Sequence, residues 1–262
     1  MNIGKKIRLS RILDEKGKTI IVPIDHAVEG YFQELEEPEK LIREFIEGGA
    51  NAILLRRGML ERTHNLIAGK LGIIYRVSGA TGTSPDVTDQ RLIASVYEAL
   101  KRGADAVVFT VYVGHPKEND MFTLFGELSD EAYELNMPLI GEVDTWPQSK
   151  EIKGELLRQG VRYLSEEGAD LIKTYFPEDE TYYKKIINYS LVPVVAAGGP
   201  KMPKPIDVLR FAKKVIDAGA VGVAFGRNVW QQKSPAKMIK ALSKIIKEKQ
   251  TVEEAMKVLG EQ

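Results

Sequence analysis

The stretch "EGGANAIL", residues 47–54, leads from a charged segment through a glycine into an apolar run. The same phrase returns as "KRGADAVVF" (101–109), "EEGADLIK" (166–173) and "DAGAVGVAF" (217–225). A charged last helical turn, a glycine that can take the left-handed conformation and then a β-branched apolar run together predict a helix that leads into a strand. Steps of 54, 65 and 51 residues separate Gly49, Gly103, Gly168 and Gly219, and each step has room for two strand–helix units. The repeat therefore predicts eight units.

Eight apolar runs fit these units, and we place them at residues 19–25, 51–56, 72–78, 105–113, 138–144, 170–175, 192–198 and 221–226. Continuously apolar runs are typical of parallel strands that are covered on both faces. Strand–helix repeats joined by right-handed crossovers close into a TIM (β/α)8 barrel. A doubly wound open sheet is the alternative, but no G-x-G-x-x-G follows the first run and no Walker A motif occurs. We expect one α/β barrel domain over residues 1–262.

Two helix-start signals lie near the C-terminus. Ser234 before Pro235 is typical of an N-cap followed by proline at the first helical position, and Thr251 to Glu254 fit a capping box. The second signal predicts a short helical extension beyond the eighth unit. We expect this extension to cover the bottom of the barrel or to make a subunit contact.

The composition excludes several function classes. With 37 basic and 37 acidic residues the chain carries no basic field for nucleic acid or for an anionic membrane. Since cysteine is absent, disulfides, thiol catalysis and thiolate metal sites are excluded. The N-terminal residues lack the apolar region of a signal peptide, and no stretch approaches the ~18 apolar residues of a membrane span. We expect a cytoplasmic protein without nucleic-acid or membrane partners.

Lys173 interrupts the apolar run of residues 170–175. Because strand residues alternate between faces, Leu171, Lys173 and Tyr175 share one face. Burial disfavours an ammonium ion, so a lysine inside a barrel can present a free amine that attacks a carbonyl and forms a Schiff base. The alternative is a lysine at a strand end that reaches water or pairs with an acid.

Two aspartates are candidates for moving the protons that Schiff-base chemistry requires. Asp25 and Asp144 end the first and fifth predicted strands, and the chemistry of a TIM barrel lies where its strands end. We therefore expect both carboxyl groups at the same mouth as Lys173. The alternative for each is a structural ion pair with Lys173 or Arg56.

Glycine-rich turns follow the last two predicted strands, in "AAGGPK" (196–201) and "FGRN" (225–228). Loops after these two strands form the usual phosphate site of the fold, where backbone amides face the anion. The alternative is that the glycines only serve tight turns. The predicted phosphate-binding residues are Gly198, Gly199, Lys201, Gly226 and Arg227.

Histidine is scarce, with His26, His64 and His115 as the three examples, and His64 falls on a predicted helix away from the mouth. A zinc aldolase needs a cluster of ligands and H-E-x-x-H is absent, so we expect neither a metal nor another cofactor. His26 is expected to anchor the first loop. Residues 78–85, "SGATGTSP", are either a flexible loop over the site or a polar connection.

These residues resemble the archaeal-type class I aldolases, a family that includes aminodideoxyheptulosonate synthases and phospho-autoinducer thiolases. The resemblance runs from about residue 3 to residue 259, with its sharpest motifs in "PIDHAVEG" (23–30), "GADLIKTYF" (168–176), "VPVVAAGGPK" (192–201) and "GAVGVAFGRNVWQ" (219–231). It implies that Lys173 is the Schiff-base lysine, that Asp25 is an acid/base and that the two glycine loops bind phosphate. It also implies a homo-oligomeric ring, commonly a decamer of two pentamers.

One departure from this family lies at the end of the fifth strand. Its aldolases and synthases carry Tyr-Pro-Arg-Gly there, with the tyrosine as proton donor or acceptor, whereas this chain reads "GEVDTWPQSK" (141–150). Counted from Pro138, the tyrosine position is Asp144; aligned on the following proline, it is Trp146. We favour Asp144, because a carboxyl group can transfer protons and an indole cannot.

Three functions follow from these residues. The first is a class I aldolase that cleaves a phosphorylated ketose such as fructose bisphosphate and gives dihydroxyacetone phosphate. The second is a transaldolase-like synthase or an acyl-transferring thiolase that uses the same lysine on another phosphorylated keto compound. The third is a non-catalytic barrel that binds a sugar phosphate. Trp146, His26 and Arg56 are secondary site candidates.

Overall fold

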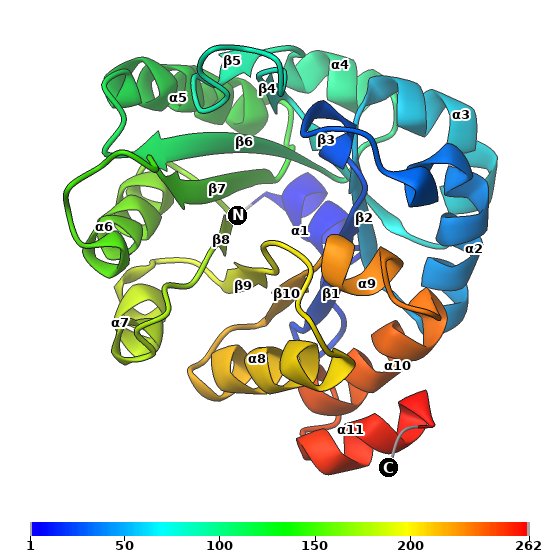
Figure 1. The fold of residues 1–262 in the computed structure, drawn as a ribbon. Coiled ribbons are helices and arrows are strands. Elements are labelled where there is room, and N and C mark those ends of the chain that lie inside the picture. The colour runs from blue at the N-terminus through cyan, green and yellow to red at the C-terminus, as the bar shows by residue number, and fades with distance from the viewer. Residues whose placement is uncertain (1, 261–262) are drawn as a thin grey trace.

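A computed structural model describes residues 2–260 and shows eight parallel strands that close into a barrel (Figure 1). The barrel strands are β1 (Thr19–Pro23), β2 (Ala52–Leu55), β3 (Gly72–Arg76), β6 (Ala106–Val113), β7 (Leu139–Thr145), β8 (Leu171–Thr174), β9 (Val194–Ala197) and β10 (Gly222–Ala224). The short strands β4 (Ser78–Gly79) and β5 (Arg91–Leu92) pair in a separate antiparallel sheet. All eight predicted strands are present, and the TIM (β/α)8 fold is confirmed.

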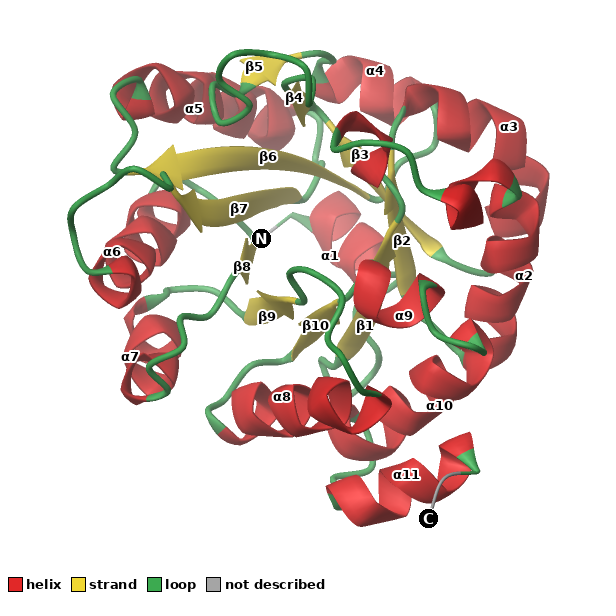
Figure 2. Ribbon diagram, viewed as in Figure 1, coloured by secondary structure: helices red, strands yellow, loops and turns green. Residues whose placement is uncertain are grey.

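Most of the helices surround the barrel on its outer side, whereas the N-terminal helix lies across one end of the barrel (Figure 2). The helices are α1 (Ile3–Leu9), α2 (Pro38–Gly48), α3 (Arg57–Ile67), α4 (Val96–Lys101), α5 (Glu118–Glu134), α6 (Lys153–Glu166), α7 (Thr181–Tyr189), α8 (Pro205–Asp217), α9 (Arg227–Trp230), α10 (Pro235–Ile246) and α11 (Val252–Leu259), with 3₁₀ turns η1 (His26–Val28) and η2 (Gln33–Glu36). None of the helices in the described part of the chain is long and apolar enough to cross a membrane.

The repeated glycine phrase has the predicted backbone conformation. Gly49, Gly103, Gly168 and Gly219 have φ angles of 82°, 75°, 101° and 116°, in the left-handed region that favours glycine. Each of these glycines turns the chain from the end of a helix into the next barrel strand. The helices then pack their apolar faces against the outward side chains of the strands, where Phe45 and Ile53, for example, are fully buried.

A second, smaller core fills the inside of the barrel. Its inward-facing side chains are Ile21, Ala52, Leu54, Ile74, Ala106, Val108, Ile140, Leu171, Val195 and Ala224. Strand residues alternate, so the next inward position lies two residues nearer the carboxyl end. On β3, β6, β7 and β8 that position holds Arg76, Thr110, Glu142 and Lys173. The interior therefore changes from apolar to charged over a single layer of side chains.

The N-terminal segment closes the opposite, amino-terminal end of the barrel. Ile12, just after α1, is fully buried and belongs to the inner core. Two ion pairs fix the segment: Lys5 Nζ lies 2.8 Å from Asp170 Oδ2, and Arg11 Nη1 lies 2.7 Å from Asp105 Oδ1. The bottom of the barrel is thus covered by residues that the sequence analysis assigned no role.

The C-terminal extension does not cover the barrel bottom, so the first of its two expected roles is wrong. Helix α11 packs against α8 and α10 on the outside of the barrel, and the N-terminal segment covers the bottom instead. Both predicted helix starts are confirmed. Ser234 Oγ accepts from the amide of Lys237, and Thr251 forms a reciprocal capping box with Glu254. A subunit contact through α11 stays a prediction.

Candidate active site

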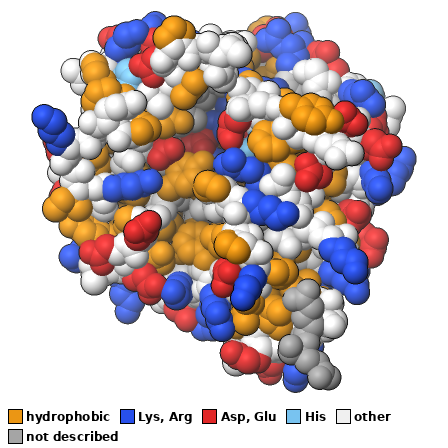
Figure 3. Space-filling view, viewed as in Figure 1, with side chains coloured by type: hydrophobic (Ala, Val, Ile, Leu, Met, Phe, Trp, Pro, Cys, Tyr) orange, Lys and Arg blue, Asp and Glu red, His pale blue; other side chains and the backbone are white. Residues whose placement is uncertain are grey.

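A cavity of about 520 Å³ opens at the carboxyl ends of the barrel strands. It lies above the inner core, where the inward side chains become charged. Acidic and basic side chains lie close together around the middle of the face that Figure 3 shows. The cavity is lined by Asp25, His26, Arg56, Arg76, Thr110, Tyr112, Glu142, Asp144, Lys173, Tyr175, Gly198, Gly199, Gly226 and Arg227, among others.

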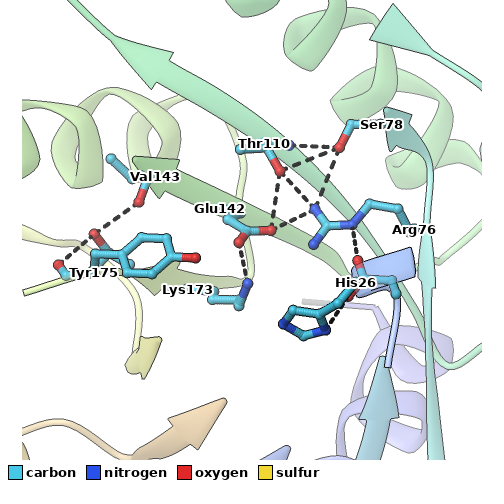
Figure 4. A network of polar contacts seen from close by, with 10 residues as sticks. His26, Arg76, Ser78, Thr110, Glu142, Val143, Lys173 and Tyr175 are labelled. Carbon is cyan, nitrogen blue, oxygen red and sulfur yellow. Dashed lines mark hydrogen bonds and ion pairs between the residues drawn. The ribbon is translucent and has the colours of Figure 1, made fainter. Parts of the chain in front are cut away.

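Lys173 lines this cavity with a side chain that is only 7% exposed. Its Nζ contacts Oε1 of Glu142, the residue directly beside it in the β7–β8 register. Figure 4 shows the amine pointing at this carboxylate. The alternative in which the lysine pairs with an acid is thus observed, yet the amine still borders the cavity. The carboxylate of Glu142 therefore balances the positive charge of the Lys173 ammonium inside the barrel.

Arg76 connects this pair to Asp25, and Figure 4 shows its guanidinium beside Glu142. Its Nε donates to Asp25 Oδ2 at 2.8 Å, and its Nη1 lies 2.5 Å from Glu142 Oε2 and 2.7 Å from Thr110 Oγ1. Asp25 therefore pairs with Arg76 rather than with Lys173 or Arg56, the partners considered from the sequence. The result is a buried chain of alternating charges that runs from Lys173 to Asp25.

The alternating charges keep two carboxyl groups ionised. Burial alone would raise the pKa of Glu142, but Arg76 and Lys173 outweigh burial and lower this pKa to about 2. Burial likewise opposes ionisation of Asp25, and the guanidinium of Arg76 holds the pKa of Asp25 well below its usual range. Both groups are carboxylates near neutral pH, so neither can donate a proton there.

Asp144 has the opposite character, although it stands on the same face of β7 as Glu142. Burial raises the pKa of Asp144 to about 6, and the negative charge of Glu142 raises it further. Two influences lower this pKa: the amide of Thr145 donates to Oδ1 at 2.7 Å, and Lys153 contributes a positive charge. A carboxyl group with this pKa exchanges its proton near neutral pH. It is the carboxyl of the cavity that is best suited to proton transfer.

Trp146 lies outside the main cavity. Its ring meets the edge of His115 at a centroid distance of 5.7 Å, and it lines a smaller neighbouring cavity of about 280 Å³ that shares Asp144 with the main one. Of the two candidates for the tyrosine position, Asp144 is therefore the one that borders the same space as Lys173.

Two tyrosines line the cavity beside these acids. Burial raises the pKa of Tyr112 and of Tyr175, and the nearby carboxylates raise both further. Both phenols are neutral at physiological pH and can donate hydrogen bonds. In Figure 4 the hydroxyl of Tyr175 points toward Lys173 and Glu142. The sequence placed Tyr175 on the face of Lys173 but assigned it no role.

The two glycine loops lie at the mouth as predicted. Gly198, Gly199, Gly226 and Arg227 line the cavity, whereas Lys201 is exposed and is not among the lining residues. A Cβ on Gly226 would come within 2.4 Å of the ring of His26, so only glycine permits this close approach. We therefore omit Lys201 from the candidate phosphate site.

Asn228 ties the two glycine loops together and was missed by the sequence analysis. Its Nδ2 donates to the carbonyl oxygens of Gly198 at 2.8 Å and Pro200 at 3.1 Å, and its Oδ1 accepts from the amide of Met202 at 2.8 Å. The side chain is fully buried, so it holds both loops in one arrangement.

His26 anchors the first loop through aromatic packing. Its ring lies edge-on to Trp230 at 5.5 Å and to Phe32 at 6.4 Å, measured between ring centroids. Trp230 Nε1 donates to the carbonyl of Pro23 at 3.0 Å, which joins α9 to the end of β1. Burial lowers the pKa of His26, so the neutral ring is favoured.

Arg56 follows β2 and also lines the cavity. Its Nε is buried and has no hydrogen-bond partner in the described part of the chain. The loop after β4 forms the adjacent wall: the amide of Gly82 donates to the carbonyl of Val28 at 2.7 Å, and His115 Nε2 lies 2.9 Å from Asp86 Oδ2. The segment 78–85 thus belongs to the site rather than being only a connection.

Arg76 was not predicted from the sequence, and Glu142 was given no role there. Both could have been found by counting inward positions, since each lies two residues beyond an inner-core isoleucine, Ile74 or Ile140. No group of three or more His, Asp or Glu side chains among residues 2–260 is arranged to hold a metal ion.

Comparison with known proteins gives a family match over residues 19–232, to the DeoC/LacD family of aldolases. One relative, 2-amino-3,7-dideoxy-D-threo-hept-6-ulosonate synthase of Halobacterium salinarum, is 32% identical over 259 residues, which cover 98% of this chain and 97% of that protein.

Two solved structures are also similar. An archaeal fructose 1,6-bisphosphate aldolase is 28% identical with a TM-score of 0.84, covering 92% of this chain and 98% of that one. A Schiff-base-forming fructose-1,6-bisphosphate aldolase is 29% identical with a TM-score of 0.84, covering 92% of this chain and 99% of that one.

Proposed function

Because this chain belongs to the DeoC/LacD family of aldolases, we propose that it is a class I aldolase in which Lys173 forms a Schiff base with a phosphorylated ketose. The observation that carries the proposal is the buried amine of Lys173, which borders the cavity and has a carboxylate beside it. A solved relative that forms a Schiff base supports the same chemistry.

The chemistry of the lysine follows from its neighbour. Lys173 loses a proton, attacks the ketone carbon and expels water to give a protonated imine. The positive charge then sits on the imine nitrogen, where Glu142 balances it as it balanced the ammonium. The iminium accepts the electron pair of the breaking C–C bond. The resulting enamine takes up a proton, and water releases the ketone product.

We assign proton transfer to Asp144. Cleavage requires a base for the hydroxyl proton of the carbon that becomes the aldehyde, and Asp144 has a pKa of about 6. Asp25 stays ionised beside Arg76, so we assign it a positioning role. It fixes the guanidinium of Arg76, which in turn pairs with Glu142. This revises the acid/base role that the family resemblance implied for Asp25.

The phosphate of the ketose would lie at the two glycine loops. Gly198, Gly199 and Gly226 line the cavity there, and the buried Nε of Arg227 has no hydrogen-bond partner among the described residues. A phosphate oxygen would satisfy this donor. The loops therefore support a phosphorylated substrate.

Fructose 1,6-bisphosphate is the first substrate to test, with dihydroxyacetone phosphate as the ketone product. The second candidate is a transaldolase-like synthase, because a relative that is 32% identical is an aminodideoxyheptulosonate synthase. Such an enzyme would use the same imine but pass the enamine carbon to an acceptor aldehyde. Assembly into a ring and a cytoplasmic location stay predictions.

Turnover measurements separate these proposals. The protein is incubated with fructose 1,6-bisphosphate, and free aldehyde is assayed with and without acceptor aldehydes. Free aldehyde supports the aldolase, and transfer without free aldehyde supports the synthase. Lys173→Met should abolish either activity. Undiminished activity in Lys173→Met would exclude Lys173 as the Schiff-base residue. Phosphate binding by the wild-type protein without turnover would favour a non-catalytic barrel.

A further inference from the structure

Three buried side-chain atoms in the described part of the chain lack a hydrogen-bond partner: His26 Nδ1, Arg56 Nε and Arg227 Nε. All three residues line the active-site cavity. Buried polar atoms are usually satisfied, so orphaned donors in a cavity indicate where a ligand can bind. Arg227 belongs to the proposed phosphate site, whereas Arg56 takes part in no step described above.

Arg56 also lacks a charge partner. The other cationic side chains of the cavity, Arg76, Lys173 and Arg227, each form an ion pair with a carboxylate. Arg56 has no carboxylate partner among residues 2–260. Its guanidinium therefore brings to the cavity wall a positive charge that Asp25 and Glu142 attract without pairing with it directly, and its hydrogen-bond donors form a planar fork.

Arg56 stands across the mouth from Lys173. In the closed barrel the order is β1-β10-β9-β8-β7-β6-β3-β2, so β2 is the fourth strand from β8 in either direction. Arg56 follows β2, while the glycine loops follow β9 and β10. A ketose bound as an imine at Lys173, with one phosphate at the glycine loops, has its other end free to extend toward β2.

We propose that Arg56 binds a second anionic group, at the end of the substrate that leaves as the aldehyde. The ligand class is a phosphate monoester or a carboxylate, both of which match the guanidinium fork. This assignment rests on the proposed function, which defines the substrate half that is bound as an imine and the half that leaves as the aldehyde. It makes Arg56 the residue that selects acceptor aldehydes with a charged end.

The test measures binding of open-chain probes that have no carbonyl group and so cannot form an imine. Hexitol 1,6-bisphosphate carries two phosphates, hexitol 6-phosphate carries one, and 6-phosphogluconate carries a phosphate and a carboxylate. We expect calorimetry to show that the wild-type protein binds the bisphosphate at least about tenfold more tightly than the monophosphate, as one charge-assisted contact would give. The affinity of 6-phosphogluconate then distinguishes a carboxylate from a phosphate at Arg56.

Two arginine variants complete the test. Arg56→Gln should bind the bisphosphate and the monophosphate equally well. Arg57→Gln is the matched control, because Arg57 donates to Tyr75 and to the carbonyl of Ile93 and does not line the cavity. It should keep the wild-type preference.

Equal affinity of the wild-type protein for the two hexitol phosphates would overturn the proposal, and so would a preference that persists in Arg56→Gln. The first comparison needs no variant, so it holds even if Arg56→Gln folds poorly. These probes form no imine, so the outcome is independent of whether Lys173 reacts. A failure of the proposed aldolase chemistry would instead appear as a lack of turnover while the binding preference remains.

Discussion

Asp144 and Glu142 lie two residues apart on one strand, yet their environments give them opposite proton affinities. Glu142 is held between two cations, whereas Asp144 is buried with weaker compensation. Two carboxyl groups whose pKa values are pushed apart mark a division of roles between electrostatic stabiliser and proton carrier. This division underlies the first two predictions.

Asp144 should make the stability of the protein depend on pH. Its folded pKa of about 6 exceeds the ordinary value of 3.8, so the folded state binds this proton more tightly than the unfolded state does. Stability is therefore lost as pH rises from about 4 to about 6, by roughly 3 kcal/mol. Asp144→Asn should remove this loss, so the variant should be more stable than the wild type at pH 7 but not at pH 4. Urea unfolding at both pH values tests this, and an equal difference at the two would contradict it.

Glu142→Gln should lower kcat by about 100-fold, because it removes the charge that balances the iminium while keeping the shape of the side chain. Thr110→Val is the control. Thr110 hydrogen-bonds with both Arg76 and Glu142, and its loss leaves both charges in place. It should cost less than about tenfold. Steady-state kinetics with the substrate that is turned over makes the comparison, and equal losses in the two variants would show that hydrogen bonding rather than charge matters.

Single residues differed in how readily the sequence predicted them. Lys173, Asp25 and Asp144 stood out because each is an ionisable group at the end of an apolar strand. Counting inward positions could have placed Glu142 and Arg76 in the barrel, but not their pairing with Lys173 and Asp25, because ion pairs across strands depend on the stagger between neighbours. Glu142 meets Lys173 only because β7 and β8 pair in the observed register.

The two glycine loops form one unit through Asn228. Asn228→Ala would leave two carbonyl groups and one amide without their partner and would loosen the loops. We expect inorganic phosphate to bind about tenfold more weakly to this variant. Asn188→Ala, a change of an exposed asparagine on α7, should leave phosphate binding unchanged. Unaltered phosphate affinity in Asn228→Ala would exclude the loops as the phosphate site.

The repeat of helix end, glycine and strand predicted the strands well, because left-handed glycine and apolar strand runs are local properties. The wall formed by residues 78–92 was not predictable, because its position depends on contacts with distant loops, such as that between Gly82 and Val28. The place of α11 was also not predictable, because it depends on packing against α8 and α10 rather than on local sequence.

The two ends of the barrel have separate tasks. The amino-terminal end is closed by ion pairs, and the carboxyl-terminal end holds the cavity. Asp170 accepts from Lys5 Nζ at 2.8 Å and from the amide of Leu139 at 2.9 Å. Asp170→Ala should therefore destabilise the protein by about 3 kcal/mol, since it leaves a buried ammonium unpaired.

Activity per folded molecule should not change in Asp170→Ala, because this residue lies at the end of the barrel opposite the cavity. Asp130→Ala, which changes an exposed aspartate on α5, is the control and should leave the unfolding free energy unchanged. Chemical unfolding with parallel activity assays makes both comparisons. A loss of activity in fully folded Asp170→Ala would show that the two ends are coupled.

The most direct test of the whole account is to trap the imine. The protein is treated with borohydride in the presence of dihydroxyacetone phosphate, digested and mapped by mass spectrometry. We predict one reduced adduct per chain, on the peptide that contains Lys173, and no adduct in Lys173→Met. An adduct on another lysine, or none in the wild-type protein, would contradict the assignment of Lys173 as the Schiff-base residue.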